Sequence, residues 1–188
     1  MPEDWTLRRR ITLSGSEISY EVLGFGPPLL LIHGTLTNSY IWRNVALRLA
    51  DRFIVYTFDL LGFGQSEHGE GLDVSIPNQA RLHAEFVETL DLEAPSVAGH
   101  DIGGAIALRA HLLEGVLFGC IALVDSRRRA TLDHPDDETP QRPPRRIRDH
   151  AHRDLRSRHS LTLAHCNPPS DGRTYADNLP KPVEGWAR

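Results

Sequence analysis

One short turn carries the residue best suited to chemistry. Asp101 stands between an apolar, strand-like run at Pro95–Ala98 and a helix-like run at Ile102–Leu113. Glycines lie two residues to either side, at Gly99 and Gly103, and they permit a sharp strand-to-helix turn in which a larger side chain would collide with backbone. The residue at the apex of such a turn is strained, and its side chain projects above the sheet. The amides that open the following helix favour an anion there.

Two further segments follow strand-like runs and contain small and polar residues. His33 and Gly34 come directly after the apolar run Leu29–Ile32. The segment Asp59–Ser66 follows the run Phe53–Phe58 and has glycines at its fourth and sixth positions. Runs as uniformly apolar as these are typical of strands covered on both faces.

The three segments, in this order, resemble the α/β-hydrolase superfamily. Gly99–Gly103 fits the small-x-nucleophile-x-small elbow of that family, with Asp101 as the nucleophile. His33-Gly34 resembles its oxyanion-loop motif, and Asp59–Ser66 resembles its D-x-x-G-x-G-x-S loop. The stretch His33–Arg43 is similar to haloalkane dehalogenases and their relatives. The resemblance covers about residues 11–126 and implies the Asp-nucleophile branch, which includes haloalkane dehalogenases and epoxide hydrolases.

An aspartate nucleophile suits displacement at a saturated carbon. Serine suits acyl transfer, whereas a serine ether formed at such a carbon would resist water. A carboxylate forms an alkyl ester instead, which a histidine-activated water can hydrolyse at the aspartyl carbonyl. The backbone amides of Thr35 and Ile102 are then expected to hold the oxyanion. The expected substrate is a small haloalkane or epoxide, and no cofactor is implied.

Two positions depart from the dehalogenase pattern. The family usually has Asn after His-Gly and Trp after the nucleophile, and both donate hydrogen bonds to the leaving halide. Here those positions are Thr35 and Ile102, and the side chain of isoleucine has no donor. An epoxide hydrolase is therefore an alternative, although the cap tyrosines of that group have only Tyr175 as a counterpart after the sixth strand.

Three residues allow a structural as well as a functional interpretation. Asp101 could serve only as the N-cap of its helix, because Asp is favoured there. Asp125, after the run Ile121–Val124, matches the triad acid of some dehalogenases, although many relatives carry Asp there without that role. Trp42 could line the substrate pocket or be a structural aromatic.

No histidine matches the catalytic base of the family, which lies in a loop after the eighth strand. His159 and His165 are expected to be solvated surface residues, and no strand-like segment after residue 126 could be the seventh or eighth. The pair His150/His152, and His134 near two aspartates, match no recognised metal-ligand spacing, so no metal site is predicted. A catalytically inactive, hydrolase-like fragment is therefore a second alternative.

The alternation of elements predicts a mostly parallel sheet with helices on both faces. The sheet is expected to contain six strands and to end at Gly119–Val124. The expected strands are Leu7–Leu13, Glu17–Leu23, Leu29–Ile32, Phe53–Phe58, Pro95–Ala98 and Gly119–Val124. The expected helices are Asn38–Ala50, with Ile41, Val45 and Leu49 on one side, then Gln79–Leu90 and Ile102–Leu113.

The composition changes abruptly after Ser126. Residues 1–126 are expected to form the N-terminal part of an α/β-hydrolase domain. Residues 127–188 are rich in Arg, Pro and His and lack periodic apolar residues, so an irregular, disordered tail is predicted. The change would follow from a frameshifted or truncated product. A third hypothesis is a binding module that uses this tail on an acidic partner.

Overall charge and composition exclude several classes. The 188 residues carry a formal net charge of −4, so nothing favours nucleic acid or a membrane surface. No apolar run approaches the ~20 residues that span a bilayer, and a cytoplasmic protein is expected. The two cysteines, Cys120 and Cys166, indicate no disulfide framework, and Cys120 is expected to be a small buried hydrophobe.

Overall fold

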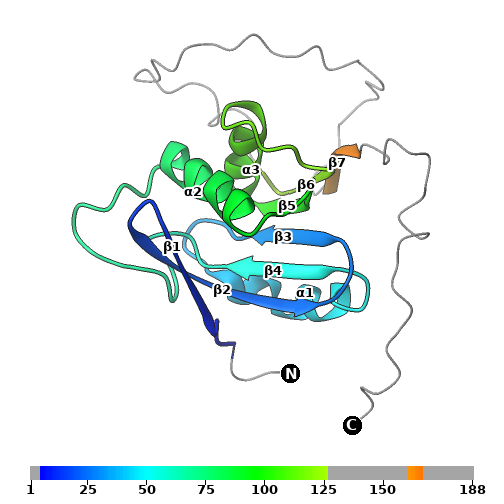
Figure 1. Cartoon of the computed structure of the whole chain (residues 1–188), viewed down its shortest axis with the longest axis horizontal. Helices are drawn as coiled ribbons and strands as arrows, with labels where there is room; N and C mark the ends of the chain where they lie inside the picture. The colour runs from blue at the N-terminus through cyan, green and yellow to red at the C-terminus, as the bar shows by residue number, and fades with distance from the viewer. Residues whose placement is uncertain (1–4, 127–160, 167–188) are drawn as a thin grey trace.

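The computed structural model describes residues 5–126 and the strand Leu161–Cys166 (Figure 1). The strands are β1 (Arg9–Leu13), β2 (Ser16–Gly24), β3 (Pro28–Ile32), β4 (Ile54–Phe58), β5 (Ser96–His100), β6 (Cys120–Val124) and β7 (Leu161–Cys166). The helices are the 3-10 helix η1 (Ser39–Trp42), α1 (Arg43–Leu49), α2 (Ile76–Thr89) and α3 (Ile102–Leu112). Within these ranges, no helix is long and apolar enough to cross a membrane.

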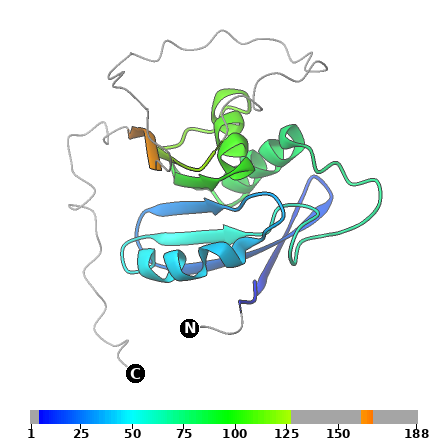
Figure 2. The same ribbon diagram turned by 180° about the vertical axis from the view of Figure 1, so that it is seen from behind.

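The strands form one mixed sheet in the order β1-β2-β4-β3-β5-β6-β7. Strands β4, β3, β5 and β6 are parallel, whereas β1, β2 and β7 pair antiparallel to their neighbours. Figures 1 and 2 show α1 on one face of the sheet and α2 with α3 on the other. This confirms the expected α/β architecture, and it places the loops after β3, β4, β5 and β6 at one edge.

The central strand β3 is apolar because both of its faces are covered. Leu30 and Ile32 belong to the core beneath α2 and α3, where Phe86 and Ile106 also lie. Leu29 and Leu31 point to the opposite side and pack in the α1-side core. A strand alternates its side chains between the two faces, so two cores require an uninterrupted apolar run.

The first two helices differ in detail from the expected ones. The segment predicted as one helix begins as η1 and continues as α1. The buried face of this segment carries Trp42 and Ala46, whereas Val45, expected on one side with Ile41 and Leu49, is 42% exposed. Helix α2 begins three residues before the predicted Gln79. Ser75 caps it by accepting the N–H of Asn78, and a proline follows in the first turn.

The six expected strands are all present as β1 to β6, but the sheet does not end at β6. Strand β7 pairs antiparallel with β6, with Leu161 opposite Val124, so the edge of β6 is covered rather than open. The expectation for Cys120 is also wrong, because Cys120 is disulfide-bonded. The other cysteine of the chain, Cys166, stands opposite it in the register of the two strands. The rest of the segment 127–188 lies outside the described residues.

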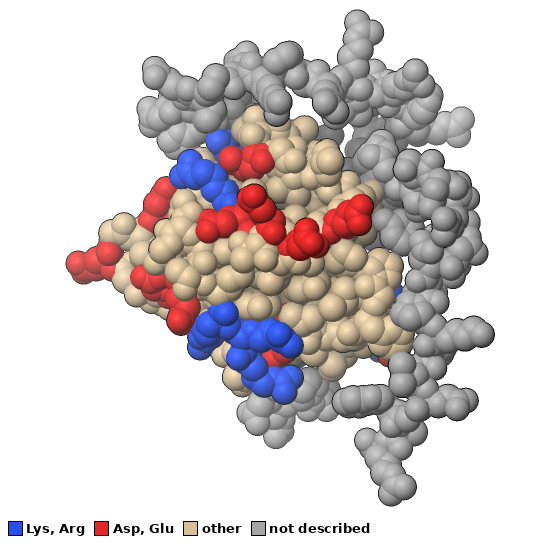
Figure 3. Space-filling view, in the orientation of Figure 1, with Lys and Arg blue, Asp and Glu red and all other residues tan. Residues whose placement is uncertain are grey.

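Charged side chains form separate groups on the face shown in Figure 3. Acidic groups follow the exposed side of α2, and basic groups gather elsewhere on this face. In the β1–β2 hairpin, Arg8 pairs with Glu21 at 2.8 Å and Arg10 pairs with Glu17 at 3.2 Å. No single sign of charge covers this face.

Candidate functional site

Asp101 occupies the apex of the turn between β5 and α3, as its flanking glycines predict. Its backbone has φ 51° and ψ −117°, a combination that costs a non-glycine residue roughly 1–3 kcal/mol. Both neighbouring glycines lie against backbone. A Cβ at Gly99 would stand 2.4 Å from the carbonyl oxygen of Gly103, and a Cβ at Gly103 would stand 2.5 Å from that of Ile32. The strained turn therefore requires glycine at both positions.

The side chain of Asp101 is directed at the loop after β3. Its Oδ2 accepts a hydrogen bond of 3.0 Å from the backbone N–H of Thr35. The same side chain makes no capping hydrogen bond to α3, so the interpretation of Asp101 as a helix cap alone is not supported. The N–H of Asp101 donates to the carbonyl of Val124 at 3.1 Å, which ties the turn to the end of β6.

The surroundings of Asp101 favour its ionised form. Partial burial raises the pKa of the carboxyl group. Hydrogen bonds from the backbone and hydroxyl of Thr35, together with the nearby N–H of Ile102 and a smaller contribution from His100, outweigh burial and leave the pKa below its ordinary value. Asp101 is therefore a carboxylate near neutral pH, and a carboxylate only accepts hydrogen bonds. The predicted oxyanion amides of Thr35 and Ile102 both act on this group.

His33 is a structural element of the same loop. Its ring is fully buried, and Nε2 accepts the N–H of Leu60 at 2.9 Å. The proton must then be on Nδ1, which donates to the carbonyl of Gly34 at 2.9 Å. Burial lowers the pKa of His33, although Gly34 and Asp59 act in the opposite direction. With both nitrogens engaged, His33 holds the loop and is not a free base.

The loop Asp59–Ser66 also belongs to the scaffold of the site. Asp59 is fully buried. Its Oδ1 accepts the N–H of Ser39 and its Oδ2 accepts the N–H of Gln65, each at 2.7 Å. Ser66 accepts the N–H of Ser19 at 2.9 Å through its hydroxyl. These bonds join the loop after β4 to η1 and β2, so this motif supports the oxyanion loop without touching Asp101.

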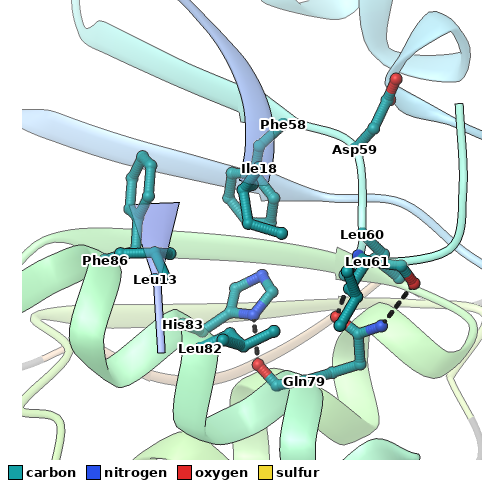
Figure 4. A pocket seen from close by; sticks show the side chains of 10 residues that line it. All are labelled: Leu13, Ile18, Phe58, Asp59, Leu60, Leu61, Gln79, Leu82, His83 and Phe86. Atoms are coloured by element: carbon teal, nitrogen blue, oxygen red, sulfur yellow. Dashed lines mark hydrogen bonds between the residues drawn. The ribbon is translucent and has the colours of Figure 1, made fainter. Parts of the chain in front are cut away.

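Gln79, the first residue of the helix expected from the sequence, is a buried polar residue. It is 1% exposed. Its Nε2 donates to the carbonyl of Leu61 at 2.9 Å, and its Oε1 accepts the N–H of Leu61 at 3.3 Å (Figure 4). The spacing of Gln79 and His83 with Leu82 and Phe86 is helical. Gln79 and His83 are polar residues on the apolar side of this helix, and this placement is the feature of the sequence that indicates buried hydrogen bonds.

The other predicted site residues, Gly34, Asp125 and Trp42, differ in how far they are buried. Gly34 touches the turn, since a Cβ there would stand 2.8 Å from the Cβ of Asp101. Asp125 is exposed at the end of β6 with φ 49°. Trp42, predicted to line a pocket, is 7% exposed and packs with Ala46 in the α1-side core. Its position fits the alternative of a structural aromatic.

Most of the other histidines named in the predictions are not among the described residues. His134, His150, His152 and His159 lie outside the described residues, and only the backbone of His165 is described, in β7. Among the described residues, no group of three or more His, Cys, Asp or Glu could hold a metal ion.

An open hollow adjoins the oxyanion loop. It lies between the loop after β3 and the loop after β4, and Leu36, the residue after Thr35, is 93% exposed at its rim. Its lining comprises Leu36, Thr37, Asn38, Tyr40, Ile41, Gly62, Phe63, Gly64 and His68. The hollow offers both apolar and polar surface directly beside the loop that touches Asp101.

Curated relatives match about half of the chain. Haloalkane dehalogenase 2 of Mycobacterium tuberculosis is 40% identical over 111 residues, which are 56% of this chain and 39% of that protein. The soluble epoxide hydrolase of Corynebacterium sp. strain C12 is 38% identical over 96 residues, 50% of this chain and 33% of that protein. The chain thus spans less than half the length of either relative.

Solved structures agree on the fold. An α/β hydrolase fold protein from Burkholderia ambifaria has a TM-score of 0.63 and 40% identity, and the match covers 65% of this chain and 45% of that one. The haloalkane dehalogenase DatA from Agrobacterium tumefaciens C58 has a TM-score of 0.58 and 26% identity, with 63% and 40% covered. The sequence family described as the alpha/beta hydrolase fold matches residues 27–187. The chain therefore belongs to the α/β hydrolase fold family.

Proposed function

We propose that this hydrolase uses Asp101 as a nucleophile on a saturated carbon, in the manner of a haloalkane dehalogenase. The observation that carries the proposal is the carboxylate itself. It stands at a strained apex with φ 51°, makes no capping bond to its helix, and is held by the amide of Thr35. Strain at such a position is retained where the side chain has a task. Similarity to haloalkane dehalogenase 2 supports the same reaction class.

The proposed reaction has two steps. An oxygen of Asp101 attacks the carbon that bears the halogen, the carbon–halogen bond breaks, and halide leaves with the bonding electrons. Water then adds to the carbonyl carbon of the resulting aspartyl ester, and the amides of Thr35 and Ile102 stabilise the oxyanion. When the oxyanion collapses, the bond between the carbonyl carbon and the alkoxy oxygen breaks, the alcohol leaves with a proton, and the Asp101 carboxylate is restored. A general base must take a proton from that water. His33 is not this base, because both of its nitrogens are engaged. We propose Asp125 as the acid that orients the base.

An epoxide hydrolase is the second candidate, and one observation favours it. Ile102 follows the nucleophile, and its side chain has no donor for a departing halide. Attack on an epoxide releases no ion, because the leaving oxygen stays attached to the substrate and takes a proton. Similarity to the soluble epoxide hydrolase of Corynebacterium supports this alternative.

The test is a single-turnover labelling experiment on the full chain. The protein is mixed with 1-bromobutane or with styrene oxide, and intact mass and peptide mapping locate any ester. An alkyl group on Asp101 supports the dehalogenase reaction, and a hydroxyalkyl group carrying the whole epoxide supports the second candidate. Asp101→Asn, which keeps the shape of the side chain and tolerates positive φ, should form neither. Folded protein without any adduct on Asp101 would identify an inactive hydrolase-like chain and contradict both candidates.

A further inference from the structure

Gln79 makes an unusual pair of contacts in the core beneath the site. Its side-chain amide donates to the carbonyl of Leu61 and accepts the N–H of the same residue. In a β-sheet, a neighbouring strand pairs with the N–H and the carbonyl of a residue in the same way. Figure 4 shows the amide reaching from α2 to the loop at Leu60 and Leu61, while the ring of His83 is bonded to the main-chain carbonyl of Gln79. One buried side chain therefore fixes a loop residue through both of its polar groups.

A continuous series of contacts leads from the two hydrogen bonds between Gln79 and Leu61 to Asp101. Leu60, the neighbour of Leu61, donates its N–H to Nε2 of His33 at 2.9 Å. His33 donates from Nδ1 to the carbonyl of Gly34 at 2.9 Å. The next residue, Thr35, donates its N–H to Oδ2 of Asp101 at 3.0 Å. Each link is a hydrogen bond or a peptide bond, so an unbroken path of contacts joins Leu61 to the amide that contacts the carboxylate.

We propose that Gln79 is a positioning residue for the reaction at Asp101. By fixing Leu61 it fixes Leu60, and through His33 it sets the backbone N–H of Thr35 against the nucleophile. The effect of Gln79 on catalysis rests on the proposed function. The structural link between Gln79 and the N–H of Thr35 does not.

No other side chain that lines the adjacent cavity can replace Gln79 as the donor to the carbonyl of Leu61. A small cavity of about 10 Å³ lies between α2 and the loop, which is about the space that one water molecule needs. Its lining is apolar apart from Gln79, His83 and Asp59, and both oxygens of Asp59 already accept hydrogen bonds. Nε2 of His83 has no partner among the described residues, but in the neutral ring it can only accept. Without Gln79, the carbonyl of Leu61 loses its donor and the loop has room to move.

The coupling is tested by NMR on the full chain with three variants. Gln79→Leu removes both hydrogen bonds, and Glu88→Gln on the exposed side of α2 is the matched control. In Gln79→Leu we expect the amide signal of Thr35 to shift and the pKa of Asp101 to rise toward its ordinary value. In Gln79→Glu, the amide signal of Thr35 should match that of the native protein while the new carboxyl group is protonated and can donate to Leu61. The signal should shift once that carboxyl group ionises. Labelling of Asp101 by 1-bromobutane should slow roughly ten- to a hundredfold in Gln79→Leu.

The outcomes separate this proposal from the proposed function. A folded Gln79→Leu protein with an unchanged Thr35 signal and an unchanged Asp101 pKa would overturn the positioning role. If Gln79→Leu does not fold, hydrogen exchange of the native chain decides. The amides of Thr35, Leu60 and Leu61 should then open together with one free energy, and independent opening of Thr35 would overturn the coupling. Absence of labelling in the native chain removes the proposed function alone, because the NMR measurements do not depend on it.

Discussion

The backbone nitrogen of Thr35 lies 3.0 Å from Oδ2 of Asp101 and donates its N–H to it, although the two residues are 66 positions apart in the chain. The contact exists because β3 and β5 are adjacent and parallel, so the loops that follow them leave the sheet at one edge. The hydrogen bond lowers the pKa of Asp101 against the effect of burial. The sheet thus brings a donor to the carboxylate at the point where the proposed reaction needs both.

Replacing Asp101 by glycine and by alanine separates the effect of backbone strain on stability from the effect of losing the charge. Both variants remove the carboxylate, but only glycine adopts φ 51° without a Cβ penalty. We expect Asp101→Gly to be more stable than Asp101→Ala by about 1–2 kcal/mol in urea unfolding. Equal stabilities would mean that the turn is not strained.

Gly103→Ala should be strongly destabilising. The new Cβ would stand 2.5 Å from the carbonyl oxygen of Ile32 and 2.6 Å from that of His33, and neither backbone group can move freely. A loss of about 2–3 kcal/mol or more is expected. The matched control is Gly69→Ala, whose nearest neighbour is a side-chain atom of Leu72 at 4.0 Å. Thermal unfolding compares the two, and comparable melting temperatures would refute the close packing at Gly103.

His83 should make stability depend on pH. Burial lowers its pKa from 6.5 to about 4, whereas the unfolded chain titrates near 6.5. Between these values the unfolded state binds more protons, so stability is full above about pH 6.5 and falls as the pH drops toward 4. The interval corresponds to roughly 3 kcal/mol. His83→Leu should reduce the slope of the urea-unfolding profile in this pH range, to which buried His33 also contributes, while His68→Gln should not. A native profile that is already flat from pH 6.5 to 4 would contradict the expectation.

Asp59→Asn should weaken the scaffold without touching the nucleophile. The carboxylate accepts two backbone N–H groups, from Ser39 and Gln65, and an amide can accept at only one of its two ends. The other N–H would face a second donor in a buried site, at a cost of about 1–3 kcal/mol. Asp51→Asn, at an exposed position, is the control for loss of charge. If both variants unfold at the same urea concentration, the buried carboxylate is not the anchor of this loop.

Asp125→Asn tests the proposed triad acid. An acid that orients the base acts in the hydrolysis of the ester, so we expect adduct formation on Asp101 to continue at its native rate. Decay of the adduct should slow by up to about 10⁴-fold. Time-resolved intact mass measures both steps. An unchanged decay rate would assign Asp125 to the structure of the strand end alone.

The sequence by itself determined the elements and the turn. Apolar runs specify strands that are buried on both faces, as the two-sided burial of β3 confirms. The glycines at 99 and 103 predict a tight apex because their effect is steric and local. The similarity of the three motifs to one family was also readable, since each motif lies within a few consecutive residues.

The tertiary structure decided the contacts between distant residues. Periodicity placed Val45 on one side with Ile41 and Leu49, but the sheet meets η1 at Trp42 and α1 at Ala46, and Val45 is exposed. The edge of β6 gained a partner in β7, whose short apolar run had no pattern strong enough to predict. Gln79 could be assigned to a helix, yet only the fold brings its amide to Leu61. Backbone hydrogen-bond partners carry no signature in the side-chain sequence, so the link from Gln79 to Thr35 and Asp101 exists only in three dimensions.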